Sequence, residues 1–141
     1  MSLMPGETDP PDQAPEAREA ELRIWCAIRR DLPIPRGKLA TQAGHAYAAA
    51  LWRAPRHVAE AYMSSPVQAK ITVGVKTQDQ LRKMFELCRE AGLPSVIVRD
   101  FGRTVFTEPT FTAMAVGPCR QSDLPSAFRR LRLLPDGEED A

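Results

Sequence analysis

The sequence has no long apolar run, no signal peptide, no cluster of metal ligands and no glycine-rich phosphate loop. Without about 18 consecutive apolar residues, a membrane-spanning helix is not expected, and the acidic, proline-rich start does not resemble a secretion signal. The cysteines are odd in number and far apart, so we expect free thiols, a reducing cytoplasmic location and no metal site. Neither a G-x-G-x-x-G loop nor a G-x-S-x-G elbow occurs, so we expect neither an organic cofactor nor a nucleophilic serine.

The net charge of +1 conceals a strong partition of charge along the chain. Residues 1–21 carry −5, residues 22–134 carry +10 and residues 135–141 carry −4. The central segment holds 14 Arg and 4 Lys, and the planar Arg group is the better phosphate ligand. This favours a nucleic acid as partner over the alternative that scattered cations only solvate the surface. We predict a disordered acidic tail over 1–20, one domain over 21–134 and an acidic tail over 135–141.

Apolar periodicity and turn residues predict an alternation of strands and helices. The expected strands are 22–29, 68–76, 95–99 and 110–116, the last stopped by Gly117-Pro118, and the expected helices are 37–53, 57–63, 78–91 and 123–131. This order predicts an α/β domain with three layers, α/β/α, and a small mixed four-stranded sheet. The link between the last two strands is too short for a crossover, so we expect these strands to be antiparallel.

The helix expected from Gly37 carries an unusual set of polar residues. Lys38, Gln42 and His45 are spaced i, i+4 and i+7 and therefore share one face, while most other positions are small or apolar. A cation, an amide and an imidazole in one line on an otherwise apolar helix indicate a site. The partial positive charge at a helix start also favours an anion there by about 0.3–1 kcal/mol.

The antiparallel pairing would bring further polar residues to the start of this helix. We expect these residues to line one cleft, formed by Lys38, Gln42, His45, Asp100, Thr104, Thr110 and Thr112. His45 or Asp100 could take a proton, Lys38 could neutralise a phosphate or an oxyanion, and Gln42 could orient water. Taken singly, each also has a plainer interpretation: a core histidine, an exposed lysine, a surface amide and a turn-forming aspartate. We expect His57 at the surface and Trp25 and Trp52 in the core.

Together, these motifs resemble those of the type 2 peptidyl-tRNA hydrolases. The resemblance covers about residues 22–134, in the family's order, through the segments RGKLATQAGHA (36–46), QAK (68–70), GLPSVIVRDFGRTV (92–105) and TFTAMAVGP (110–118). It implies a mixed four-stranded sheet with helices on both faces and hydrolysis of the ester that joins a peptide to tRNA. It also implies that no metal or organic cofactor is needed and that the protein forms a homodimer.

The resemblance assigns the functional positions to Lys38, Gln42, His45, Asp100 and Thr104, with Thr110 and Thr112. We expect the tRNA phosphates to be held by Arg36, Lys38, Arg53, Arg56, Lys70 and Arg103. The chain departs from the family at Phe101, Val105 and Pro109, where Ala, Gln and Gly are usual. These changes leave a second hypothesis open: a catalytically weak or silent RNA-binding or regulatory member of the same fold.

Overall fold

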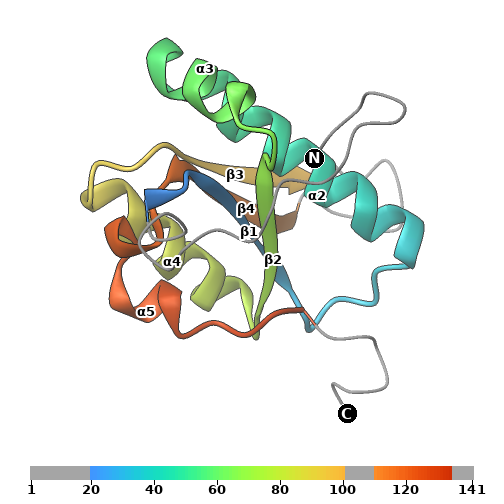
Figure 1. Cartoon of the computed structure of the whole chain (residues 1–141). Helices are drawn as coiled ribbons and strands as arrows, with labels where there is room; N and C mark the ends of the chain where they lie inside the picture. Colours follow the sequence, from blue (N-terminus) through green and yellow to red (C-terminus); the bar gives the residue numbers. More distant parts are fainter. Residues whose placement is uncertain (1–19, 101–109, 135–141) are drawn as a thin grey trace.

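A computed structural model describes residues 20–100 and 110–134, and four strands of these residues form one mixed sheet (Figure 1). The strand order is β2-β1-β4-β3. The strands are β1 (Arg23–Arg29), β2 (Ala69–Val75), β3 (Ser95–Asp100) and β4 (Thr110–Cys119). β1 pairs in parallel with β2 and antiparallel with β4, and β4 pairs antiparallel with β3, as the short link between them predicts.

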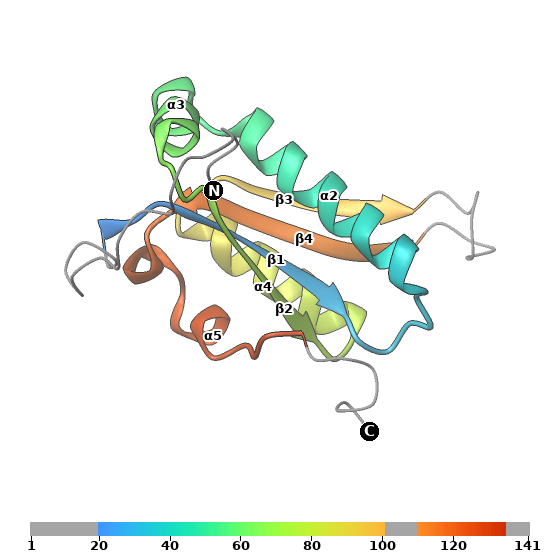
Figure 2. The same ribbon diagram turned by 45° about the vertical axis from the view of Figure 1, so that its right-hand side comes forward.

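Helices cover both faces of this sheet (Figure 2). One face carries α2 (Arg36–Arg53) and α3 (Arg56–Ser64), and the other carries α4 (Gln78–Glu90) and α5 (Ser126–Arg129). Thr77 caps α4 by accepting a hydrogen bond from the Gln80 amide, and Gly92 follows the helix with φ of 75°. The predicted three-layer α/β/α class with a mixed four-stranded sheet is confirmed.

Because both faces of the sheet are covered, the central strand β1 is apolar on both sides. Ile24, Cys26 and Ile28 pack in the core beneath α2, while Trp25 and Ala27 belong to the core beneath α4. All three cysteines are free and buried, and burial raises the pKa of each thiol to about 12. The thiols therefore behave as small apolar groups and not as nucleophiles.

The last strand differs from the prediction that Gly117-Pro118 ends it. β4 continues through both residues to Cys119, which pairs with Arg23 across an irregularity in the register. A proline is tolerated at such a position because the regular ladder is already interrupted. Gly117 has φ of 113°, and a Cβ atom there would lie 2.5 Å from the Arg23 carbonyl oxygen. Only glycine fits this close approach.

The prediction of one helix over 123–131 is wrong. A short 3₁₀ turn, Gln121–Asp123, is followed by the four-residue α5, which begins after Pro125. Beyond α5 the chain extends along β2, where the Gly74 amide donates to the Arg132 carbonyl and the Leu134 amide donates to the Thr72 carbonyl. Across residues 20–100 and 110–134, no helix is both long and apolar enough to cross a membrane.

Candidate active site

The first two turns of α2 hold Lys38 and Gln42 over the end of β3. The Lys38 Nζ atom lies 2.9 Å from Asp100 Oδ2, and the Asp100 side chain is only 4% exposed. The Gln42 Nε2 atom donates a longer hydrogen bond, 3.4 Å, to the same oxygen. The i, i+4 spacing on one helix face therefore brings a cation and an amide onto one buried carboxylate.

Thr112 completes this group through a bulge in β4. Val98 lies opposite Ala113 and Arg99 lies opposite Phe111, so Thr112 is the extra residue of β4 at this step. The bulge turns Thr112 toward α2, where its hydroxyl donates to Gln42 Oε1 at 3.0 Å. Bulges commonly re-aim a side chain in this way beside functional sites.

These contacts form one connected polar group, the Lys38–Asp100 cluster, made of Lys38, Gln42, Asp100 and Thr112. The Thr112 hydroxyl fixes which end of the Gln42 amide faces Asp100, because the hydroxyl binds the amide oxygen and leaves the NH₂ group toward the carboxylate. The first turn of α2 contains no acidic residue of its own, so no side chain of that turn opposes the partial positive charge at the helix start. The cluster is therefore a rigid, mostly buried arrangement beside a surface that favours an anion.

The other predicted site residues are not members of this cluster, and their positions differ. His45 is exposed and lies about 4.5 Å farther along the axis of α2 than Gln42. Thr110 is paired directly with Asp100 across the two strands. Thr104 and Arg103 lie outside the described residues, as do Phe101, Val105 and Pro109.

The predicted phosphate-binding cations of residues 20–100 fall into two separate groups. Arg36 begins α2 beside the cluster, where Lys38 is already paired with Asp100. Arg53 ends the same helix, about 25 Å from Arg36 at 1.5 Å per residue. Arg56 begins α3, and the Lys70 ammonium lies 5.4 Å from the ring centroid of Tyr62 in α3. Among the predicted cations that lie in the described residues, the structure therefore places only Arg36 and Lys38 at the end of α2 that carries the cluster, and Arg103 lies outside these residues.

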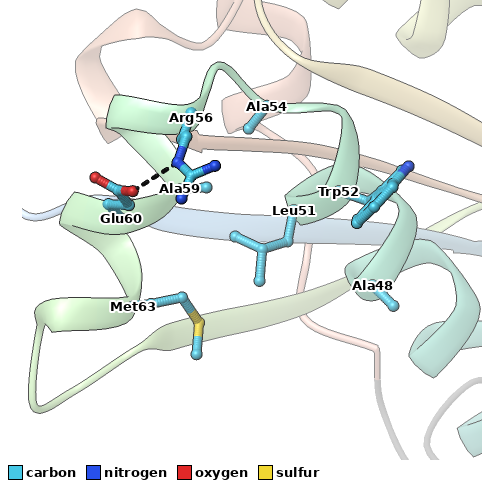
Figure 3. A pocket seen from close by; sticks show the side chains of 8 residues that line it. All are labelled: Ala48, Leu51, Trp52, Ala54, Arg56, Ala59, Glu60 and Met63. Carbon is cyan, nitrogen blue, oxygen red and sulfur yellow. Dashed lines mark hydrogen bonds and ion pairs between the residues drawn. The ribbon is translucent and has the colours of Figure 1, made fainter.

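Trp52 is not a core residue, contrary to the sequence prediction. It is 89% exposed, whereas Trp25 is 5% exposed, as predicted. The buried face of α2 carries Ala46 and Ala50, and Trp52 lies about 200° around the helix from Ala50, away from the sheet. Trp52 lines a largely apolar pocket of about 570 Å³ between α2 and α3, and Figure 3 shows the Arg56–Glu60 ion pair on its other side. His57 is exposed, as predicted.

Comparison with known proteins identifies the family of the chain. The sequence model described as Peptidyl-tRNA hydrolase PTH2 matches residues 22–134. The chain belongs to this family. A peptidyl-tRNA hydrolase of Methanopyrus kandleri is 36% identical over 109 residues, which are 76% of this chain and 93% of that protein. That of Methanocaldococcus jannaschii is 33% identical over 117 residues, 80% of this chain and all of that protein. A probable peptidyl-tRNA hydrolase 2 of Drosophila melanogaster is 32% identical over 116 residues, 79% of this chain and 61% of that protein.

The family match confirms the resemblance inferred from the motifs, and its span contains the complete sheet and the Lys38–Asp100 cluster. The part of the chain that the structure describes holds no group of three or more His, Cys, Asp or Glu suited to a metal ion.

Sequence reasoning named every member of the cluster but missed the exposure of Trp52. The signal that could have found it was helical phase, because alanines at 46 and 50 already fill the buried face of α2.

Proposed function

We propose that the Lys38–Asp100 cluster is the hydrolytic centre of a peptidyl-tRNA hydrolase, which uses water to cleave the ester between a peptide and the terminal ribose of its tRNA. Membership of the peptidyl-tRNA hydrolase PTH2 family supports this reaction for the chain. The observation that carries the location is the buried Lys38–Asp100 pair, tied through Gln42 to Thr112. An ester is a labile bond, so positioned polar groups and an activated water suffice without a covalent intermediate.

Lys38 and the start of α2 supply the positive charge for this reaction. Attack of water places negative charge on the ester carbonyl oxygen, and a fixed ammonium at the positive start of a helix stabilises that charge. Removing one such donor typically costs about 10²–10³-fold in turnover. Asp100 holds the ammonium in position, because its carboxylate lies 2.9 Å from it and is almost fully buried.

Gln42 and Thr112 act as positioning residues in this proposal. Their hydrogen bond fixes the amide, and the amide in turn contacts Asp100, so the three side chains hold one geometry. Thr110, which pairs with Asp100, and Thr104 complete the proposed substrate-contacting set. We also propose that Arg36, Arg53, Arg56, Lys70 and Arg103 contact tRNA phosphates.

The proton from water goes to His45 or to Asp100, and the two residues offer different environments for it. His45 is exposed on α2, where it meets bulk solvent, while Asp100 is buried and bonded to Lys38 and Gln42. Loss of a general base typically costs about 10²–10⁴-fold in turnover. Chemical rescue separates the candidates, since added imidazole restores turnover to His45→Ala only if His45 carries the proton.

Two finer points belong to the same proposal. We place the protein in the cytoplasm, where peptidyl-tRNA arises during translation, and we take a homodimer as its assembly. Sedimentation of the purified protein across a range of concentrations tests the assembly. A protein that stays monomeric throughout contradicts it.

The central test is release of free peptide from purified peptidyl-tRNA, with binding of uncharged tRNA measured in parallel. His45→Ala and Asp100→Asn are compared with His57→Ala, the exposed histidine of α3, which should keep wild-type turnover. We expect at least one of the first two variants to lose turnover while tRNA affinity stays close to wild type. Full turnover by both, in folded protein, contradicts the location. Binding of tRNA by the wild type without any release supports the silent RNA-binding member instead.

A further inference from the structure

Two arginines are stacked on one aromatic ring behind the Lys38–Asp100 cluster. The guanidinium carbon of Arg82, from α4, lies 5.4 Å from the ring centroid of Phe111, and that of Arg99, from β3, lies 5.6 Å from it. Arg99 and Phe111 are direct partners across β3 and β4. We call these three residues the Phe111 platform.

The platform is held in place by an arginine that is already neutralised. Arg29 donates from Nη1 to the Phe111 carbonyl oxygen at 3.1 Å. Its other nitrogens make two hydrogen bonds to the Asp31 carboxylate, at 3.0 and 2.8 Å. Arg29 therefore fixes the backbone of Phe111, and the Arg82 and Arg99 residues that stack on its ring are both exposed.

Two guanidinium groups on one ring concentrate positive charge, which favours an anion beside them. Stacking on the ring restricts both guanidinium groups and leaves their N–H groups, which lie in the plane of each group, able to bond phosphate oxygens. The same arrangement can also receive the face of an unpaired base. Chemically, the platform is suited to RNA more than to an isolated small anion.

The position of the platform links it to the proposed reaction. Arg99 is adjacent in sequence to Asp100, and Phe111 is adjacent to Thr112, but each pair of neighbours faces opposite sides of the sheet. β3 is the last strand of the sheet, so a single strand edge separates the platform from the cluster. A nucleic acid that places its terminal ester at Asp100 can pass around this edge to the platform. Arg53, at the far end of α2, and Arg56, at the start of α3, lie farther from Asp100 and suit phosphates more distant from the ester.

We propose that the Phe111 platform is a tRNA-binding subsite that holds backbone phosphates of the substrate close to its ester, through Arg82 and Arg99. This inference rests on the proposed hydrolysis of peptidyl-tRNA. It adds residues that family resemblance did not suggest and makes them positioning residues, because they act on the tRNA and do not touch the reacting atoms.

The test compares Arg82→Gln and Arg99→Gln with Arg89→Gln. Arg89 is a matched control, because it lies on the same helix, 5.5 Å from the ring centroid of Phe85, at the end of α4 away from the platform. Two substrates are used: peptidyl-tRNA, and adenosine that carries the same peptide on its ribose and has no phosphate. KM and kcat are measured over a series of salt concentrations, together with affinity for uncharged tRNA.

We expect Arg82→Gln and Arg99→Gln each to raise KM for peptidyl-tRNA about three- to tenfold with kcat within twofold of wild type. The slope of log affinity against log salt should become shallower by about 0.7–0.9 for each phosphate that the variant no longer neutralises. Turnover of peptidyl-adenosine should not change, and Arg89→Gln should match wild type on both substrates. Phe111→Leu, which keeps an apolar side chain but removes the ring, should raise KM for peptidyl-tRNA in the same direction.

Unchanged KM, tRNA affinity and salt slope in both variants would overturn the inference and leave the platform to another acidic partner, such as a protein segment. An equal loss on peptidyl-adenosine would also overturn it, because that substrate offers no phosphate. Failure of the proposed reaction gives a different result. Wild-type protein would then release no peptide, while the affinities of the variants for uncharged tRNA would still show whether Arg82 and Arg99 bind phosphates.

Discussion

The two ends of α2 reverse the usual distribution of polar and apolar residues. At its start, Lys38 and Gln42 are drawn into a buried cluster with Asp100, and at its end Trp52 stands 89% exposed. A buried polar group and an exposed large apolar group are the two informative departures from normal burial. The groups at the first end are fixed by one another, as the proposed chemistry requires. The second has only an accessible surface, lined by Trp52 and the half-exposed Met63.

The comparison is tested most strongly by removing one cation from each end of α2. Lys38→Met removes the ammonium that is paired with the Asp100 carboxylate, whose side chain is 4% exposed, so we expect the free energy of unfolding to fall by about 3 kcal/mol. Turnover should fall about 10²–10³-fold with it. Arg53→Met removes an exposed cation of similar length and should change stability by less than about 0.5 kcal/mol. Urea unfolding and peptide release measure both variants, and equal losses at the two ends would contradict the distinction.

Removal of one hydroxyl sharpens the comparison within the cluster. Thr112→Val keeps the shape of the side chain but leaves the buried Gln42 oxygen without its donor, which should cost about 1–3 kcal/mol of stability. Turnover should fall as well, since the Gln42 amide loses its fixed orientation. Thr41→Val on α2 is the control, because its hydroxyl only bonds the Gly37 carbonyl at an exposed position. Thermal unfolding of the two variants should therefore differ clearly, and a Thr112→Val protein as stable as Thr41→Val would be inconsistent with a bulge that serves the cluster.

A second ion pair, between Arg29 and Asp31, tests whether burial accounts for the difference in stability expected between Lys38→Met and Arg53→Met. The hydrogen bond from Arg29 holds the pKa of Asp31 below its usual value, and the Asp31 side chain is 37% exposed. A carboxyl group with a lowered pKa in the folded state stabilises the fold above its unfolded pKa, about 3.9, and loses this contribution as the pH falls through the folded value.

Asp31→Asn should therefore cost about 0.2–1 kcal/mol at neutral pH, discounted for solvent screening. The difference from wild type should disappear as the pH falls below about 4. Unfolding of the two proteins at several pH values measures it. A loss at neutral pH as large as that of Lys38→Met would show that exposure does not decide the strength of these pairs.

The smallest expected effect is at Trp52. Trp52→Ser removes a side chain that is 89% exposed, so thermal stability should change by less than about 0.5 kcal/mol and peptide release should match wild type. A tryptophan in the core would behave very differently, since its truncation typically costs about 3–5 kcal/mol. A loss of that size at Trp52 would mean that the indole packs against something in solution.

Helical phase and strand order account for what could be predicted from the sequence. Lys38 and Gln42 share a face because they are four residues apart, and Asp100 joins them because a short link makes β3 and β4 antiparallel. Simple alternation along β4 fails at Thr112: Met114 faces α4, so Thr112 would face α4 too, yet the bulge turns it to Gln42. A bulge depends on tertiary pairing and leaves no clear local signal in the residues TFTAM. The exposure of Trp52 is a different case, because helical phase does carry the signal: Trp52 lies away from the buried Ala46 and Ala50, and the prediction of a core tryptophan followed its apolar character instead.

The segment that follows α5 has a consequence for how the molecule behaves among other copies of itself. Two backbone hydrogen bonds and a bridge between Val73 and Leu133 join this segment to the outer side of β2. An uncovered strand edge is a template on which another chain can add a strand, and covering it is a common protection against aggregation. Shortening the chain to end before Leu131 would uncover β2. Its cost should therefore appear first as association that increases with protein concentration, before any loss of peptide release from the chains that stay dispersed.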